Sequence, residues 1–149
     1  MLHFTIESRP PSAQPGHPLS ILTPLGGHVT VTTLTISDMD RGQPLAVTFD
    51  AVAARLQQLP GVYWEPDGSF VWTQSGEVTY RLEGQLADGV PYLQHLELMG
   101  AASDLMLDQL LALFQTADEP VHLMFQLIRI GVYVDEFDLR RLLHVACLH

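Results

Sequence analysis

The sequence of 149 residues contains no lysine and no asparagine, so all seven of its basic charges are arginines. Without lysine the chain has no amine for a Schiff base and no P-loop lysine for a nucleotide phosphate. Acidic residues outnumber the arginines and give a formal net charge of -10 at pH 7. Because this charge repels phosphate backbones, it disfavours a nucleic acid partner; it suits solubility or a basic partner protein.

Cysteine and long apolar runs are also scarce. The single Cys147 cannot form a disulfide within the chain, which fits a reducing compartment. No apolar run approaches the roughly 18 residues that a membrane span requires, and the N-terminus lacks the basic-then-apolar pattern of a secretory signal. We expect a cytoplasmic protein without membrane contact, folded as a single globular domain over residues 1–149, with 47% hydrophobic residues to build a core.

Common catalytic motifs are missing from the sequence. It has no Walker loop, no Rossmann glycine pattern, no nucleophile elbow and no Cys-x-x-Cys pair. Cys147 lies near His144 and His149, but a reactive thiol needs an electropositive niche and structural zinc prefers four ligands. We therefore interpret Cys147 as an apolar residue of an amphipathic helix and predict no cofactor from these motifs.

Residues 62–98 are organised as four strands joined by three turns of one design. The turns are Pro66-Asp67-Gly68, Gln74-Ser75-Gly76 and Ala87-Asp88-Gly89. Each ends in a glycine that can take the left-handed conformation of a three-residue hairpin. Such hairpins would pair Glu65 with Ser69, Thr73 with Glu77, and Leu86 with Val90. The pattern predicts an antiparallel four-strand meander.

Alternation along these strands divides the meander into an apolar face and a mixed face. The apolar face collects Val62, Trp64, Phe70, Trp72, Val78, Tyr80, Leu82, Leu86, Val90, Tyr92, Leu96 and Leu98. The mixed face carries acids and the apolar or aromatic side chains Tyr63, Val71, Leu93, His95 and Met99. We predict that these five residues form an interaction face.

The rest of the chain supplies helices and further strands. Apolar spacing predicts helices over 49–59, 104–115 and 136–146, capped by Thr48 or Asp50, by Ser103 and by Asp135. Strands are expected over 2–7, 28–37 and 121–128, with extended chain over 132–134. The proline-rich stretch 8–27 is predicted to be a long surface loop. Together these elements indicate an α+β fold arranged as a two- or three-layer sandwich.

The order of a helix, three or four antiparallel strands, a helix and a strand, over residues 48–128, resembles the core of the PD-(D/E)xK nucleases, the restriction-endonuclease-like superfamily. The acid-x-lysine triplet of that family falls on Glu97-Leu98-Met99. The resemblance implies Mg²⁺ or Mn²⁺ held by Glu97 and a second acid, with Met99 in place of the catalytic lysine. The predicted hairpins set Glu77 diagonal to Glu97 and leave Glu83 too far along its strand, so Glu77 is the preferred second ligand.

Three functions are compatible with these observations. Because a thioether at Met99 cannot stabilise developing negative charge, we favour a non-catalytic interaction module on a nuclease-like scaffold, which binds another protein or a second copy of itself. The alternatives are a Mg²⁺- or Mn²⁺-dependent nuclease that uses Glu77 and Glu97, and a binding protein similar to the small acidic secretion chaperones. The proline-rich stretch 8–27 is a further candidate binding element.

Overall fold

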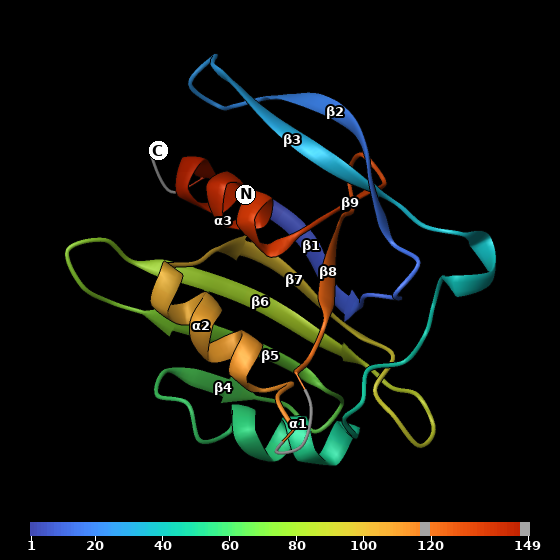
Figure 1. Ribbon diagram of the computed structural model, residues 1–149. Coiled ribbons are helices and arrows are strands. Elements are labelled where there is room, and N and C mark those ends of the chain that lie inside the picture. The colour runs from blue at the N-terminus through green and yellow to red at the C-terminus, as the bar shows by residue number, and fades with distance from the viewer. Residues whose placement is uncertain (117–119, 147–149) are drawn as a thin grey trace.

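The computed structural model describes residues 1–116 and 120–146 (Figure 1). Its elements along the chain are β1 (Leu2–Ser8), β2 (Gln14–Leu22), β3 (His28–Thr35), the 3₁₀ helix η1 (Asp38–Asp40), α1 (Phe49–Leu56), β4 (Val62–Trp64), β5 (Ser69–Gln74), β6 (Tyr80–Ala87), β7 (His95–Ala101), α2 (Asp104–Ala112), β8 (Leu123–Leu127), β9 (Val132–Val134) and α3 (Glu136–Ala146).

The nine strands form one sheet in the order β2-β3-β9-β8-β1-β7-β6-β5-β4. Each of these neighbouring pairs is antiparallel. The N-terminal strand β1 lies between β7 and β8, so it joins the meander β4–β7 to the two C-terminal strands. The predicted α+β class and the four-strand meander are confirmed.

The three α-helices share one hydrophobic core with one face of the sheet. The buried members of this core from the helices are Val52, Ala53 and Leu56 of α1, Met106, Leu107 and Leu110 of α2, and Leu139, Leu142 and Leu143 of α3. Phe4, Ile6, Trp72 and Leu98 belong to the same cluster, and Figure 1 shows α2 crossing in front of β5 and β6. The helices therefore form one layer over the sheet.

The first predicted turn of the meander is confirmed, whereas the other two are longer than predicted. The Glu65 N–H donates to the Ser69 carbonyl at 2.9 Å, and Gly68 has a φ of 93°. Thr73, however, lies opposite Arg81 instead of Glu77, and Leu86 lies opposite Leu96 instead of Val90. These registers differ from the predicted ones by even numbers of residues. Trp72 and Tyr80 consequently still lie on the same face of the sheet.

Because the second and third turns are longer than predicted, four apolar residues do not lie where the sequence predicted them. Val78, Val90 and Tyr92 were assigned to the buried face, but they lie in the connections and are exposed. Leu93 was assigned to the interaction face, but it is 0% exposed and belongs to the core. The backbone of Leu93 pairs with the segment before α1, because the Leu93 N–H donates to the Val47 carbonyl at 2.8 Å.

The proline-rich stretch is an edge strand, so the prediction of a loop over 8–27 is wrong. β2 covers Gln14–Leu22 at the end of the sheet, with an irregular register between Pro15 and Pro18. Pro18 lies opposite Thr32, whose N–H points away from β2 toward α3. Opposed residues in an antiparallel pair orient their backbone groups alike, so an N–H at position 18 would face solvent. Proline costs this edge no hydrogen bond.

The N-cap residues predicted for the three helices are confirmed. The side chains of Thr48, Ser103 and Asp135 accept hydrogen bonds from backbone N–H groups at 3.2 Å, 3.1 Å and 3.0 Å. α1 ends at Leu56 and α2 at Ala112, each three residues before the predicted end. Successive hydrogen bonds between residues three apart continue past the end of both helices, which explains why the apolar spacing also continues.

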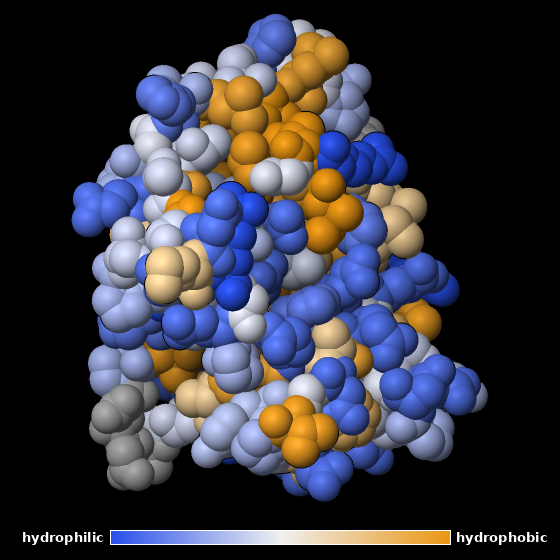
Figure 2. Space-filling view, turned by 90° about the vertical axis from the view of Figure 1, so that its right-hand side faces the viewer, coloured by the Kyte–Doolittle hydropathy of each residue, from blue (hydrophilic) through white to orange (hydrophobic). Residues whose placement is uncertain are grey.

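The surface combines an acidic character with scattered hydrophobic side chains. On the side drawn in Figure 2, hydrophobic side chains gather toward the top and hydrophilic ones fill the middle. The larger exposed hydrophobic side chains include Met1, Leu22, Leu25, Met39, Tyr63, Leu105, Ile130 and Phe137. Within residues 1–116 and 120–146, no helix is long and apolar enough to cross a membrane.

Candidate functional site

The candidate site lies on the sheet face opposite the three helices. The strand registers align Tyr63, Val71, Glu83, Met99 and His3 as one row across five strands of that face. Tyr63 stands at the edge on β4 with 66% of its surface exposed, while Val71 and Met99 are half-buried. The row is a band of apolar and aromatic surface interrupted by one acid.

A second row on the same face is displaced from the first by two residues along β1, β5, β6 and β7. It aligns Ser69, Gln85, Glu97, Thr5 and Gln126. Between the two rows is a shallow hollow of about 220 Å³, whose lining includes His3, Glu83, Gln85, Glu97 and Met99. The β6–β7 pairing brings the acids, Gln85 and Met99 together, and His3 joins them because β1 pairs with β7, some ninety residues away along the chain.

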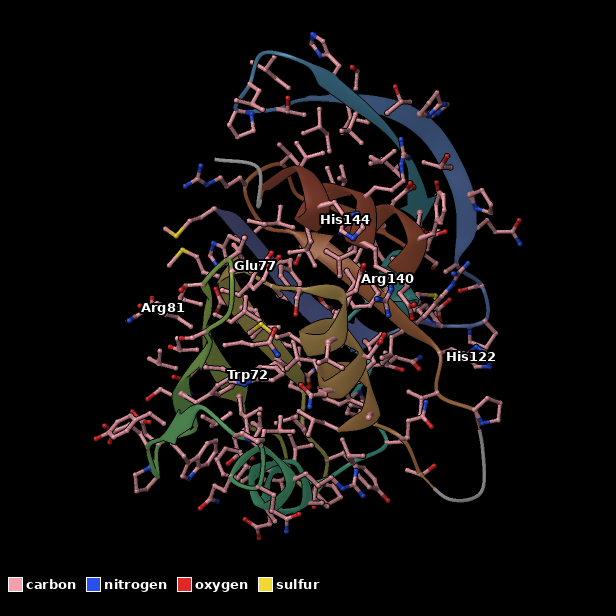
Figure 3. All side chains as sticks on the ribbon, turned by 90° about the vertical axis from the view of Figure 1, so that its left-hand side faces the viewer. Trp72, Glu77, Arg81, His122, Arg140 and His144 are labelled. Atoms are coloured by element: carbon pink, nitrogen blue, oxygen red, sulfur yellow. The ribbon has the colours of Figure 1, made fainter. Side chains whose placement is uncertain are left out.

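The register reverses the choice between the two acids proposed to accompany Glu97. Glu83 lies opposite Met99 and is therefore diagonal to Glu97, at about 7–8 Å between backbones. Glu77 was placed there by the predicted hairpin, but it lies in the connection between β5 and β6 and pairs with neither β6 nor β7. Figure 3 shows Glu77 on that connection, away from Arg81 and Trp72. The predicted position of Glu77 is wrong, because the second turn has five residues between its strands instead of three.

Glu83 and Glu97 already have partners. Glu97 Oε1 lies 2.6 Å from His3 Nε2, and Glu83 Oε1 lies 3.1 Å from Arg81 Nη2. The His3 side chain is one-quarter exposed and the Arg81 side chain is mostly exposed. In the described part of the chain, no group of three or more His, Cys, Asp or Glu side chains is arranged to hold a metal ion.

The five residues of the predicted interaction face have different positions. Tyr63, Val71 and Met99 share one row, as described. His95 begins β7 two residues before Glu97, so it lies on the same face and is half-buried. Leu93 is the exception, because it points into the core.

Two side chains of this face were not identified from the sequence. His3 alternates with the half-buried Leu2 and the buried Phe4, which signals its face but not its distant partner Glu97. Tyr133 of β9 aligns with Gln126, and its hydroxyl donates to Glu7 at 3.5 Å. Burial, with the nearby Glu7 carboxylate, raises the pKa of Tyr133 above 10.0.

A separate polar cluster joins α2 to α3. The Arg140 guanidinium donates to Asp104, Asp108 and Glu136 at 3.2 Å, 2.6 Å and 3.0 Å, and His144 Nε2 lies 2.7 Å from Asp104 (Figure 3). Burial disfavours the charge of Arg140, but the three carboxylates outweigh it and raise its pKa. The hydrogen bond with His144 is the main cause that lowers the pKa of Asp104.

His144 is the described member of a group with Cys147 and His149 whose side chains could serve as soft metal ligands or as a nucleophile and its base. His144 pairs with Asp104 on the side of α3 that faces α2. Cys147 and His149 lie outside the described residues.

Comparisons with known proteins leave the interpretation with the structure itself. No protein-family model matches the chain, and no curated protein and no solved structure shows significant similarity to it.

Proposed function

We propose that the chain is a small, acidic, non-catalytic protein-interaction module of the cytoplasm, built on a nuclease-like scaffold, and that a partner protein binds the face of the β4–β7 meander opposite the helices. The observation that carries this proposal is the row formed by Tyr63, Val71 and Met99. Covering an exposed tyrosine and neighbouring aliphatic side chains removes apolar area from water, and the phenol keeps a polar end at the rim. Such a band, bordered by polar residues, is typical of binding surfaces.

The charges on the face favour a basic partner. Glu83 lies within the apolar row and Glu97 lies beside it, and the whole chain carries a net charge of -10. A second copy would bring the same acids to the interface, and like charges across an interface oppose association. We therefore place a partner with arginine or lysine around an apolar centre ahead of self-association. A secretion-chaperone-like role is a special case of this proposal, because it also requires a partner protein on an uncovered surface.

Site-specific photo-crosslinking tests the proposal. A photoreactive benzoylphenylalanine replaces Tyr63 in the row, and in a matched control it replaces Val78, which is also apolar and exposed but lies in the connection between β5 and β6. We expect a defined protein adduct from position 63 alone, and we expect it to decrease when Met99→Glu is added or when salt is raised. Equal adducts from both positions, or an adduct from position 63 that Met99→Glu leaves unchanged, contradict the proposal.

A divalent-metal nuclease is the second candidate, and one observation favours it. The strand register places Glu83 diagonal to Glu97, which is the first residue of the acid-x-Met triplet. Two carboxylates at this separation can bind one cation between them. One oxygen of each carboxylate is already engaged, Glu97 Oε1 with His3 and Glu83 Oε1 with Arg81, so His3 and Arg81 would compete with a metal ion for these two acids. Calorimetric titration with Mn²⁺ tests this candidate: binding that Glu97→Gln and Glu83→Gln each abolish, together with DNA cleavage, supports it, whereas no heat at millimolar Mn²⁺ rejects it.

A further inference from the structure

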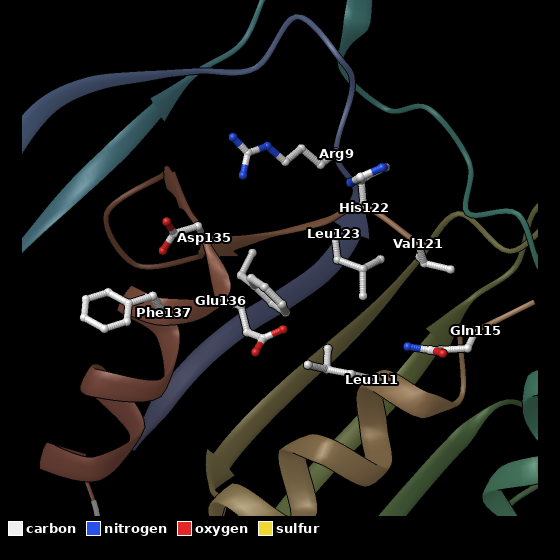
Figure 4. A pocket seen from close by; sticks show the side chains of 10 residues that line it. Arg9, Leu111, Gln115, Val121, His122, Leu123, Asp135, Glu136 and Phe137 are labelled. Atoms are coloured by element: carbon white, nitrogen blue, oxygen red, sulfur yellow. The ribbon is translucent and has the colours of Figure 1, made fainter. Parts of the chain in front are cut away.

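A second hollow lies on the other side of the molecule, where the ends of four elements meet (Figure 4). Its volume is about 370 Å³, and it is lined from the end of β1, the end of α2, the start of β8 and the start of α3. This volume lies within the range of small-molecule sites, near its lower end. The hollow belongs neither to the sheet face proposed above nor to the predicted acid pair.

The cationic side of the hollow is Arg9. Most other arginines are already engaged: Arg41, Arg81, Arg140 and Arg141 pair with carboxylates, and Arg55 donates to the carbonyl groups of Leu113 and Gln115. Among residues 1–116 and 120–146, the Arg9 guanidinium has no such partner, while its backbone N–H donates to the His122 carbonyl at 2.9 Å. Figure 4 shows Arg9 and His122 together at the upper rim. Five guanidinium donors are thus available to an anionic ligand.

The anionic side is formed by Asp135 and Glu136 at the start of α3. Asp135 uses Oδ1 to cap the helix, accepting from the Asp138 N–H at 3.0 Å. Glu136 uses Oε2 to accept from Arg140 Nε at 3.0 Å. Each carboxylate therefore keeps one oxygen that no described residue engages, and both side chains line the hollow. Their positions are set by the helix cap and the Arg140 pair, which prepares these oxygens for a cationic group.

Apolar side chains line the hollow beside its charged groups. Leu111, Val121, Leu123 and Phe125 line the hollow, and Phe125 is fully buried in the core. Figure 4 shows Leu111 and Leu123 between Glu136 and Gln115, while Phe137 points outward. An apolar group of a ligand can cover these side chains while its charged groups reach the rim.

We propose that this hollow binds a small zwitterion with an apolar side chain, such as an apolar amino acid or a short peptide. The carboxylate of the ligand pairs with Arg9, its ammonium group pairs with the free oxygens of Asp135 and Glu136, and its side chain packs on Leu111 and Leu123. A carboxylate alone would meet the two acids, and an amine alone would leave Arg9 without a partner. The zwitterion is the ligand class that satisfies both sides of the hollow.

Matched ligands and NMR titration of the whole chain test this proposal. The probes are L-phenylalanine and the dipeptide Ala-Phe, compared with N-acetylphenylalanine, which lacks the ammonium group, and phenylalaninamide, which lacks the carboxylate. We expect shifts of the Leu123 and Glu136 amides, and affinities for both analogues about tenfold weaker than for the better zwitterion. The ratio of the two zwitterion affinities distinguishes a free amino acid from a peptide.

An arginine variant and its control complete the test. Arg9→Gln should weaken the better zwitterion about tenfold and leave phenylalaninamide unchanged, whereas Arg81→Gln, an equal charge change on the far sheet face, should alter neither. The spectrum of Arg9→Gln reports whether the variant folds, and Asp135→Ser, which keeps a helix cap, weakens the zwitterion independently of Arg9. No shift at about 10 mM zwitterion, equal affinity for all four probes, or shifts confined to other surfaces would overturn the proposal.

Discussion

Asp138 and Arg141 of α3 serve β3 as a substitute for a neighbouring strand. β3 meets β9 at the single pair Leu34 and Tyr133. Beyond that pair, the Thr32 N–H donates to Asp138 Oδ2 at 2.9 Å, and Arg141 Nη1 donates to the Thr30 carbonyl at 2.8 Å. Asp138 and Arg141 also pair with each other at 2.9 Å. We predict that this clasp holds the β2–β3 hairpin against α3.

The size of the effect follows from burial. The Asp138 side chain is 7% exposed, so Asp138→Ala leaves the Thr32 N–H without a partner and removes a hydrogen bond to a charged group, which costs about 1.5–3 kcal/mol. The Arg141 side chain is 42% exposed, so water replaces most of its pair and adds about 0.5 kcal/mol. We expect Asp138→Ala to lower the free energy of unfolding by about 2–3.5 kcal/mol. Asp138→Asn keeps an acceptor and should cost about 1 kcal/mol.

Urea unfolding, followed by the fluorescence of Trp64 and Trp72, measures these differences. Asp88→Ala is the control, because Asp88 is exposed in the β6–β7 connection and its removal changes the net charge equally. Hydrogen exchange of the Thr32 amide should accelerate in Asp138→Ala more than exchange in the meander. If Asp138→Ala and Asp138→Asn cost the same, or if Thr32 exchange is unchanged, the clasp does not stabilise the hairpin.

Three further predictions concern the α2–α3 cluster and the glycine under Phe70. Arg140→Ala leaves three carboxylates facing one another and should cost about 1–2 kcal/mol in urea unfolding, less at high salt; a loss that salt does not change would contradict an electrostatic role. The hydrogen bond with His144 lowers the pKa of Asp104 from its ordinary 3.8, so the stability that Asp104 contributes is complete above pH 3.8 and is lost as the pH falls through the lower pKa of the folded state. Asp104→Asn should therefore reduce the loss of unfolding free energy at acidic pH. An unchanged pH dependence in this variant would contradict a role for Asp104. A Cβ at Gly84 would lie 2.2 Å from Phe70 Cζ, so Gly84→Ala should cost about 1–3 kcal/mol, and the double variant with Phe70→Leu should recover part of it; strictly additive losses would show that the ring does not cause the strain.

The sequence was sufficient for features that depend on local chemistry. Thr48, Ser103 and Asp135 mark helix starts because their side chains accept from the N–H group three residues later. The Pro66-Asp67-Gly68 turn was recognised because a glycine with positive φ closes a three-residue hairpin. The two faces of the meander were also predictable. Side chains alternate with a period of two, and the predicted strand registers at the second and third turns differ from the observed ones by an even number of residues, which leaves each strand side chain on the same face.

Tertiary structure decided which distant residues meet. β1 pairs with β7 and brings His3 to Glu97, and the longer β5–β6 connection exchanges Glu77 for Glu83 beside that acid. The zwitterion hollow likewise assembles Arg9 with the start of α3. Alternation tells which way a side chain points but not which strand lies next to it, because strand neighbours are chosen by burial of the whole sheet under the helices. The proline-rich stretch shows the same limit: only its place at the sheet edge, where a missing N–H costs nothing, makes it a strand.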